Sequence, residues 1–291
     1  MPFRLESGGY NRRRTVTVAL PYRTVFTHRE TPQMIQSVER AALILKALGS
    51  EPARLGVTEV AERVGLAKAT TYGLLRTLET QQLVEQDSET GKYQLGPALL
   101  QLGNAYLGNH ELRARSMLWA ESLATRSREA VQIGVLYGAD VLVVHHVFRP
   151  DNSVQILEVG ASIPWHACAL GKAIVALVEP EQREAMLRGE LPRLTGRTIT
   201  DPAELARELE RVEQRGHAVE DEEAIVGEAG IAAGVFHHRG HVAGAIGITG
   251  AAESILLDSR RAALVTAVRD AARGLSRELG AGRLGARLAG A

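Results

Sequence analysis

The side chains best suited to specific chemistry gather in one short stretch, from Lys68 to Arg76. It contains small hydroxyl and methyl groups, one phenol and two cations, and no acidic residue falls between Arg63 and Arg76. At the N-terminal end of a helix, small side chains can approach base edges, a tyrosine can donate a hydrogen bond, and a lysine can neutralise a phosphate. We therefore predict contact with duplex DNA, against the alternative of an ordinary solvated helix face. The predicted contacts are Lys68, Ala69, Thr70, Thr71, Tyr72 and Arg76.

Two other groups of reactive side chains are weaker candidates. Cys168 and His166 are close in sequence, which would permit a thiol nucleophile beside a base. A lone buried cysteine is usually inert, however, and no third, orienting group is evident. His237, His238 and His241 fall in a predicted hairpin turn with no cysteine or evident acid nearby, which disfavours a metal site. We therefore expect no catalytic residue, no metal and no cofactor.

Composition limits the class of protein. The 291 residues carry 34 basic and 34 acidic side chains, so contact with nucleic acid depends on a local basic patch rather than on net charge. The single cysteine excludes an internal disulfide and a cysteine-rich zinc site. The most apolar run, at 141–147, is far shorter than the about eighteen residues of a membrane span. These features predict a cytoplasmic globular protein with no membrane partner.

The elements around the predicted DNA contact follow the order of a winged helix-turn-helix. Apolar residues three and four apart predict a first helix at 35–48, a second helix runs from Thr58 to Gly65, and a third covers 68–81. The expected inward residues of the first helix are Ile35, Val38, Ala41, Ala42, Leu45 and Leu48. A hairpin at 83–95 then places Lys92 near phosphate, although a plain exposed lysine is the equal alternative. The predicted DNA-binding domain spans residues 34–95.

Four further segments complete the predicted organisation. Residues 1–33 carry six arginines without helical or strand periodicity, which favours a disordered extension over a basic arm that contacts DNA. Residues 96–111 form a linker helix whose apolar stripe we expect to pack in a homodimer or homotetramer. Residues 112–280 alternate helices with strand pairs, which predicts an α+β domain with an antiparallel sheet. Residues 281–291 form a tail.

Across roughly residues 35–280, the chain resembles the IclR family of bacterial regulators. In the first domain the resemblance rests on IQSVERA at 35–41, GLAKATT at 65–71 and KYQLG at 92–96. In the second it rests on HACALGK at 166–172 and on the acidic run at 216–223 followed by IAA at 231–233. The resemblance implies a winged helix-turn-helix joined by a linker helix to a GAF-like effector-binding domain.

The resemblance also implies where a small-molecule effector binds. Carried over to this sequence, the effector-binding residues are Gln155, Ala169, Leu170, Gly171, Glu220 and Gly230. Amides at a helix N-terminus attract an anionic or polyhydroxyl ligand, and a carboxylate accepts hydrogen bonds from hydroxyls. Many relatives have an aspartate in place of Glu220 and a cysteine in place of Gly230, which implies a reshaped pocket. Arg149 is a further candidate, as a partner for phosphate or carboxylate, against the alternative of a surface arginine.

Three stretches are similar to family members that control glycerol catabolism: HELRAR at 110–115, HHVFRPD at 145–151 and residues 242–250. This similarity implies a repressor of a catabolic operon that binds a double-stranded DNA operator and responds to glycerol or glycerol 3-phosphate. Three alternatives stay open: an effector that is a small organic acid, a C-terminal domain that only oligomerises, and an enzyme with an accessory nucleic-acid domain.

Overall fold

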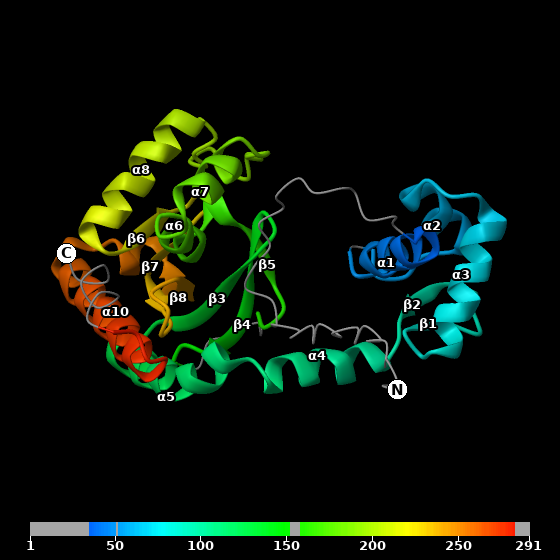
Figure 1. Ribbon diagram of the computed structural model, residues 1–291, viewed down its shortest axis with the longest axis horizontal. Coiled ribbons are helices and arrows are strands. Elements are labelled where there is room, and N and C mark those ends of the chain that lie inside the picture. Colours follow the sequence, from blue (N-terminus) through cyan, green and yellow to red (C-terminus); the bar gives the residue numbers. More distant parts are fainter. Residues whose placement is uncertain (1–34, 51, 152–157, 283–291) are drawn as a thin grey trace, which may run out of the picture. The chain divides into compact units, whose positions relative to one another are not determined.

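The structure is a computed structural model that describes residues 35–50, 52–151 and 158–282 (Figure 1). The predicted extension at 1–33 and all but the first two residues of the predicted tail lie outside the described residues. Within them, a helical domain with a small hairpin is followed by helix α4 (Ala98–Gly108) and then by an α+β domain. The fold class is therefore the predicted one.

The first domain consists of three helices and a two-stranded antiparallel hairpin. Its elements are α1 (Gln36–Leu48), α2 (Val57–Val64), α3 (Lys68–Thr80), β1 (Val84–Gln86) and β2 (Tyr93–Leu95). Helix α2 ends at Gly65, whose φ of 67° is the left-handed conformation that glycine adopts without strain. The core consists of Ile44, Leu48, Leu55, Val60, Leu75, Leu78, Val84 and Tyr93. This core holds α3 through Leu75 and Leu78 and leaves the opposite side of the helix exposed.

Helix α1 packs through a stripe that only partly matches the predicted one. Ile44, Ala47 and Leu48 are buried, whereas Ile35 and Val38 are 69% and 65% exposed. Periodicity did not separate the two stripes, because positions 41, 44, 45 and 48 have the same three-and-four spacing as the predicted set. The prediction was therefore wrong for Ile35, Val38 and Ala42, and right for Leu48 and for Ala41 and Leu45, which are partly buried against the core.

Helix α4 lies between the two domains in sequence and exposes apolar side chains. None of its 11 residues is buried, and Leu100, Leu102 and Tyr106 are all exposed. The chain enters it through Gly96, where a Cβ would lie 2.3 Å from the carbonyl oxygen of Gln82, so only glycine fits there. Such an apolar surface on a single helix is what a subunit contact requires.

The second domain is built on a six-stranded antiparallel sheet with the order β5-β4-β3-β8-β7-β6 (Figure 1). Its strands are β3 (Ala130–Tyr137), β4 (Asp140–Val147), β5 (Ser162–Pro164), β6 (Ala218–Asp221), β7 (Glu228–Phe236) and β8 (Val242–Ala251). The two predicted hairpins, β3–β4 and β7–β8, are both present. They join through β3 and β8, a pairing that brings together strands more than a hundred residues apart.

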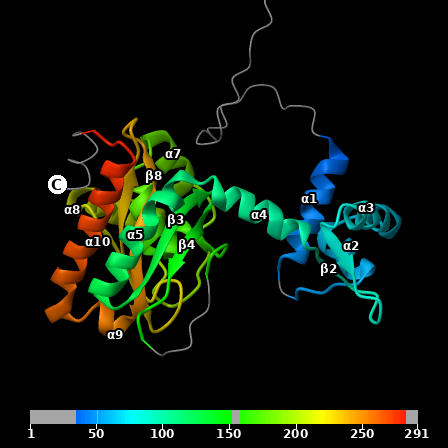
Figure 2. The same ribbon diagram turned by 90° about the horizontal axis from the view of Figure 1, so that it is seen from below.

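Helices cover both faces of this sheet. The helices are α5 (Glu111–Ser127), the 3-10 turn η1 (Trp165–Ala167), α6 (Ala169–Val175), α7 (Pro180–Leu187), α8 (Pro202–Arg215), α9 (Ala252–Ile255) and α10 (Asp258–Glu278). Helices α5 and α10 lie side by side on one face (Figure 2). In the part of the chain that the structure describes, no helix combines the length and apolar character needed to cross a membrane.

The two faces of the sheet carry side chains of different size. In β7, Ile231 packs with α5 and α10, whereas Ala232 packs with α6. In β8, likewise, Ile246 packs with α5 and α10, whereas Ala245 packs with α6. Because successive strand residues point to opposite faces, the alternation places small residues under α6. The short α6 can therefore approach the sheet closely, and the cavity described below lies on this side.

Candidate nucleic-acid interface and ligand pocket

Most of the predicted DNA contacts on α3 are exposed. The exposed members of the set are Lys68, Ala69, Thr70, Tyr72 and Arg76. Thr71 differs, because its side chain is fully buried and its hydroxyl donates a hydrogen bond to the carbonyl oxygen of Ala67 at 3.2 Å. The Thr71 side chain therefore lies on the inward face of α3, packed in the core, and is not one of the exposed residues.

The start of α3 also offers backbone donors. Its N-cap is Ala67, whose side chain cannot accept a hydrogen bond, so the first-turn amides have no capping side chain. The first turn carries no acidic residue. The amides and the partial positive charge at this end of a 13-residue helix suit a phosphate group.

The turn between β1 and β2 is held by Asp87. Its Oδ1 accepts hydrogen bonds from the backbone amides of Glu89 and Thr90, at 3.0 Å and 2.8 Å, and from the Thr90 hydroxyl. These hydrogen bonds, those of Thr90 first, lower the pKa of the Asp87 carboxyl. Lys92 follows this turn directly, so the predicted wing contact is carried by an ordered hairpin.

The exposed cations of this domain differ in their partners. Nη1 of Arg76 lies 2.8 Å from Oε2 of Glu79, and Nζ of Lys92 lies 4.0 Å from Oε2 of Glu59. Lys68 forms no ion pair with any described residue. Of the three predicted cationic contacts, Lys68 is therefore the one whose charge is not already balanced by a carboxylate of a described residue.

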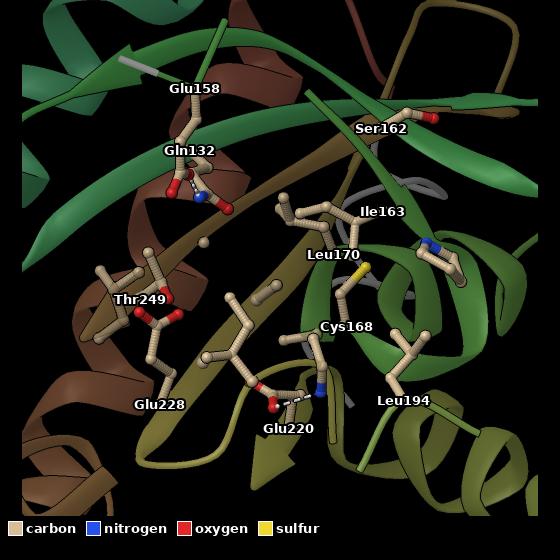
Figure 3. A pocket seen from close by; sticks show the side chains of 18 residues that line it. Gln132, Glu158, Ser162, Ile163, Cys168, Leu170, Leu194, Glu220, Glu228 and Thr249 are labelled. Carbon is tan, nitrogen blue, oxygen red and sulfur yellow. Dashed lines mark hydrogen bonds between the residues drawn. The ribbon is translucent and has the colours of Figure 1, made fainter. Parts of the chain in front are cut away.

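A cavity of about 240 Å³ opens in the second domain between α6 and the strands β6, β7 and β8 (Figure 3). Four of the predicted effector residues line it: Ala169, Leu170, Glu220 and Gly230. Gly171 and Arg149 are not among the described residues that line it, and Gln155 lies outside the described residues. The fold thus brings segments about sixty residues apart in sequence into one site.

Glu220, at the third position of β6, forms the floor of this cavity. Its side chain is 6% exposed, and its Oε1 accepts hydrogen bonds from the backbone amides of Glu223 at 2.6 Å and Ala224 at 3.3 Å. Burial raises the pKa of Glu220 to about 7, against the opposing effect of these two amides. Glu220 therefore both closes the loop that follows β6 and presents a carboxyl group that titrates near neutral pH.

Two of the predicted glycines have different structural roles. A Cβ at Gly171 would lie 2.1 Å from the carbonyl oxygen of Trp165, so glycine is needed for α6 to pack against η1. A Cβ at Gly230 would lie 3.4 Å from the Cβ of Ala169 and 3.6 Å from Oε2 of Glu220. Gly171 therefore serves packing, whereas a side chain at Gly230 would occupy the cavity beside Glu220.

A buried ion pair connects two walls of the cavity behind its lining. Lys172 on α6 is fully buried, and its Nζ donates to Oε1 of Glu223 at 2.6 Å. The hydroxyl of Thr198 donates to the carbonyl oxygen of Glu223 at 2.7 Å. Burial raises the pKa of Glu223, although Lys172 opposes this. The loop that forms hydrogen bonds with Glu220 therefore depends on Lys172 for its place.

Four polar residues that line the other end of the cavity were not predicted: Gln132, Glu158, Glu228 and Thr249 (Figure 3). The Gln132 amide donates to the Glu158 carboxylate, and the Glu158 backbone amide donates to Nδ1 of His146 at 3.2 Å. Burial, and then the neighbouring charge of Glu158, raise the pKa of Glu228. Gln132 could have been suspected from the sequence, since it is an amide within an apolar strand. Glu158 and Glu228 come together only because of the order of the strands in the sheet.

The other reactive groups do not assemble into a catalytic pair. Nε2 of His166 lies 3.0 Å from the carbonyl oxygen of Pro192, whereas the Cys168 thiol contacts the Trp165 carbonyl oxygen and the Gly171 amide. Burial raises the pKa of Cys168 to about 12, which keeps the thiol protonated. No group of three or more potential metal ligands occurs within the described ranges.

Known proteins match both halves of the chain. The family model described as bacterial transcriptional regulator IclR, C-terminal, covers residues 104–277, and the IclR helix-turn-helix domain covers residues 37–88. Over 250 residues, the chain is 48% identical to the glycerol operon regulatory protein of Streptomyces griseus, an alignment that covers 86% of this chain and 98% of that protein.

Solved structures show the same fold. An IclR transcriptional regulator from Alicyclobacillus acidocaldarius has a TM-score of 0.74 at 27% identity, covering 85% of this chain and 100% of that one. An IclR homologue from Microbacterium hydrocarbonoxydans, complexed with 4-hydroxybenzoate, has a TM-score of 0.70 at 23% identity, covering 84% and 98%.

Proposed function

Because the chain belongs to the IclR family of bacterial transcriptional regulators, we propose that it represses a glycerol-catabolic operon and leaves its operator when a small ligand binds. The 48% identity to a glycerol operon regulatory protein, across 98% of that protein's length, carries this proposal. The protein is a DNA-binding regulator. What we propose is that it represses the operon and which ligand it binds. We place its action in the cytoplasm, where an operator is accessible.

For the DNA contact, we propose that α3 enters the major groove with its N-terminal end toward the bases. Thr70 and Tyr72 then face base edges, and Ala69 allows the close approach. Lys68 and the uncapped amides of α3 bind one phosphate, and Lys92 on the hairpin binds another. Arg76 contributes less, because Glu79 already balances its charge.

For the assembly, we propose a homodimer, or a homotetramer made of two dimers, in which α4 contacts a second copy. The support is the exposed apolar surface of α4, which includes Leu100 and Leu102. A two-fold protein matches a two-fold operator, and two recognition helices then read half-sites about one helical turn apart. A single copy would read only one half-site.

For the ligand, we propose that the cavity above Glu220 holds glycerol or glycerol 3-phosphate. Glu220 offers a carboxylate acceptor, while Ala169, Leu170 and Gly230 supply the surrounding surface. Gly171 acts by fixing the start of α6. Arg149, which forms an ion pair with Asp151 at 2.7 Å, is the candidate cation for a phosphate group.

A footprinting titration tests the proposal. Fragments upstream of glycerol-uptake and glycerol-kinase genes in the protein's own genome should show a protected stretch with two half-sites about 10 base pairs apart. Deletion of the gene should raise expression of the operon, and the ligand should release the protein from the fragment.

The control is Lys46→Ala, which removes an exposed cation from the last turn of α1 in the same domain and should leave protection unchanged. Protection without release by either ligand would limit the proposal to DNA binding. A genome without any protected fragment near these genes would overturn it.

A further inference from the structure

The charges around the cavity narrow the class of ligand, a step that rests on the function proposed above. We propose that the effector is an uncharged polyol of about the size of glycerol, and that the cavity selects against phosphorylated or carboxylated relatives. Three features carry this proposal: the charges in the lining, the partners of two cations outside it, and an open acceptor atom on Glu220.

The lining is acidic. Three of its 18 described residues are carboxylates, namely Glu158, Glu220 and Glu228, and none of the 18 is lysine, arginine or histidine. An anionic ligand in this cavity would therefore meet like charges in a site partly shielded from water, where such repulsion is strongest.

Two cations outside the lining, Lys172 and Arg149, already have carboxylate partners. Lys172 is fully buried behind the lining and pairs with Glu223 at 2.6 Å, and Arg149 pairs with Asp151 at 2.7 Å. Burial first, and then the neighbouring charge of Glu158, raise the pKa of Glu228, while Arg149 opposes this. A phosphate placed beside Glu158 and Glu228 would meet two lining carboxylates of its own sign.

Glu220 offers an acceptor directed at the cavity. Both hydrogen bonds to its carboxylate reach Oε1, and among the described residues no group donates to Oε2. Oε2 lies on the side of Gly230, a lining residue, and the Glu220 side chain is more than nine-tenths buried. A hydroxyl donor from a ligand would complete its hydrogen bonding. Each hydroxyl of a polyol brings one such donor without adding charge.

A cationic ligand would also suit carboxylates, but the rest of the lining opposes it. Ile163 and Leu170 present apolar surface to the cavity, which suits the carbon chain of a polyol (Figure 3). An ammonium group would have to lose its hydration shell beside these side chains, which is costly unless it is fully paired. The uncharged polyol combines hydroxyl donors with this apolar contact.

Isothermal titration calorimetry of the full chain, purified without glycerol, tests the proposal at pH 8. The ligands are glycerol, glycerol 3-phosphate and 3-amino-1,2-propanediol, which share a three-carbon chain and differ in charge. Glycerol should bind at least about tenfold more tightly than either charged analogue.

A charge-removing variant sharpens the test. Glu228→Gln keeps the size and an acceptor of the side chain, and it should improve the affinity for glycerol 3-phosphate relative to that for glycerol at least about fivefold. Glu158→Gln serves the same purpose if the first variant does not fold. Glu181→Gln on α7, an exposed carboxylate outside the cavity, should change neither affinity.

Three results would overturn the inference: glycerol 3-phosphate binding as tightly as glycerol, the amine binding more tightly, or no heat from any of the three. The proposed function fails on different evidence, because it is judged by the footprint near glycerol genes. A protected operator together with preferential binding of glycerol 3-phosphate would retain the regulator and reject the uncharged ligand.

Discussion

The α3 surface and the cavity are both polar sites, but they are constructed in opposite ways. The α3 surface comes from nine consecutive residues, 68–76, and its outward side chains make few contacts with the rest of the domain. The cavity is assembled from distant segments, and its Glu220 carboxylate holds the surrounding chain as well as lining the cavity. We therefore expect substitutions on α3 to alter DNA binding alone, and substitutions around the cavity to alter ligand binding and stability together.

The largest expected effect is at the buried ion pair behind the cavity. Lys172→Met removes one partner and leaves the Glu223 carboxylate buried, with its Oε2 already lacking a hydrogen bond among the described residues. We expect a loss of about 3–5 kcal/mol in the free energy of unfolding. Urea unfolding followed by tryptophan fluorescence reports on the second domain alone, because both tryptophans, Trp119 and Trp165, lie in it.

The control is the double variant Lys172→Met/Glu223→Gln, which removes both charges and should recover most of the lost stability. The same two proteins should retain the circular-dichroism transition of the first domain. If Lys172→Met were as stable as the wild type, the loop after β6 would not depend on this pair, and the comparison with α3 would lose its main support.

The next effect is a pH dependence caused by Glu220. Its folded-state pKa of about 7 exceeds the ordinary value of 4.5, so the native state binds this proton more tightly than the unfolded chain does. The stability due to this proton is complete below pH 4.5, falls as the pH rises toward 7, and is absent above that. The difference is on the order of 3 kcal/mol.

Glu220→Gln should remove this dependence while keeping an acceptor for the amides of Glu223 and Ala224. Urea midpoints from pH 5 to pH 8 should therefore fall more steeply for the wild type than for the variant. Because Glu223 and Glu228 titrate in both proteins, the difference between the two curves isolates Glu220. Parallel curves would show that the Glu220 carboxyl is not held in a desolvated environment.

The same contrast explains what sequence patterns could predict. The turn at Gly65 and the small side chains at 69 and 70 are local features, so the helix-turn-helix order was predicted correctly. Thr71 was predicted as a DNA contact, and only its packing shows that its side chain lies inside the domain. In α1, spacing alone did not show that the predicted residues Ile35, Val38 and Ala42 stay exposed while Ile44 and Ala47 are buried.

Around the cavity, the family resemblance supplied Ala169, Leu170, Glu220 and Gly230, and local patterns supplied the two hairpins. The pairing of β3 with β8 follows from neither. That pairing sets Gln132 opposite Gly247 and so builds the acidic end of the cavity, which has no signature in any one stretch of sequence.

On α3, the larger effect is expected on operator choice. Tyr72→Phe removes a hydroxyl donor and Thr70→Ala removes a hydroxyl group, and neither side chain has a core contact to lose. Each should change the preference among single-base operator variants by about 1–3 kcal/mol. Gel-shift titrations against a panel of such variants measure this, and the urea transition of the second domain should not move. An unchanged ranking for both proteins would remove these side chains from the base edges.

The smallest effects are expected from the phosphate contacts. Lys68→Ala and Lys92→Ala should weaken binding to all operator variants alike and reduce the slope of log affinity against log salt by about one unit each. Lys46→Ala, an exposed lysine on α1, is the matched control and should leave the slope unchanged. Oε2 of Glu59 lies 4.0 Å from Nζ of Lys92, whereas Lys68 forms no ion pair within the described ranges. The change in slope should therefore be smaller for Lys92→Ala than for Lys68→Ala.

Glu59→Gln should then strengthen DNA binding slightly in the wild type and not in Lys92→Ala, since the effect of Glu59 on the phosphate contact acts through that lysine. Equal slopes for Lys68→Ala and the wild type would place the N-terminal end of α3 away from the DNA backbone. The contrast between the exposed α3 surface and the buried cavity depends on that contact.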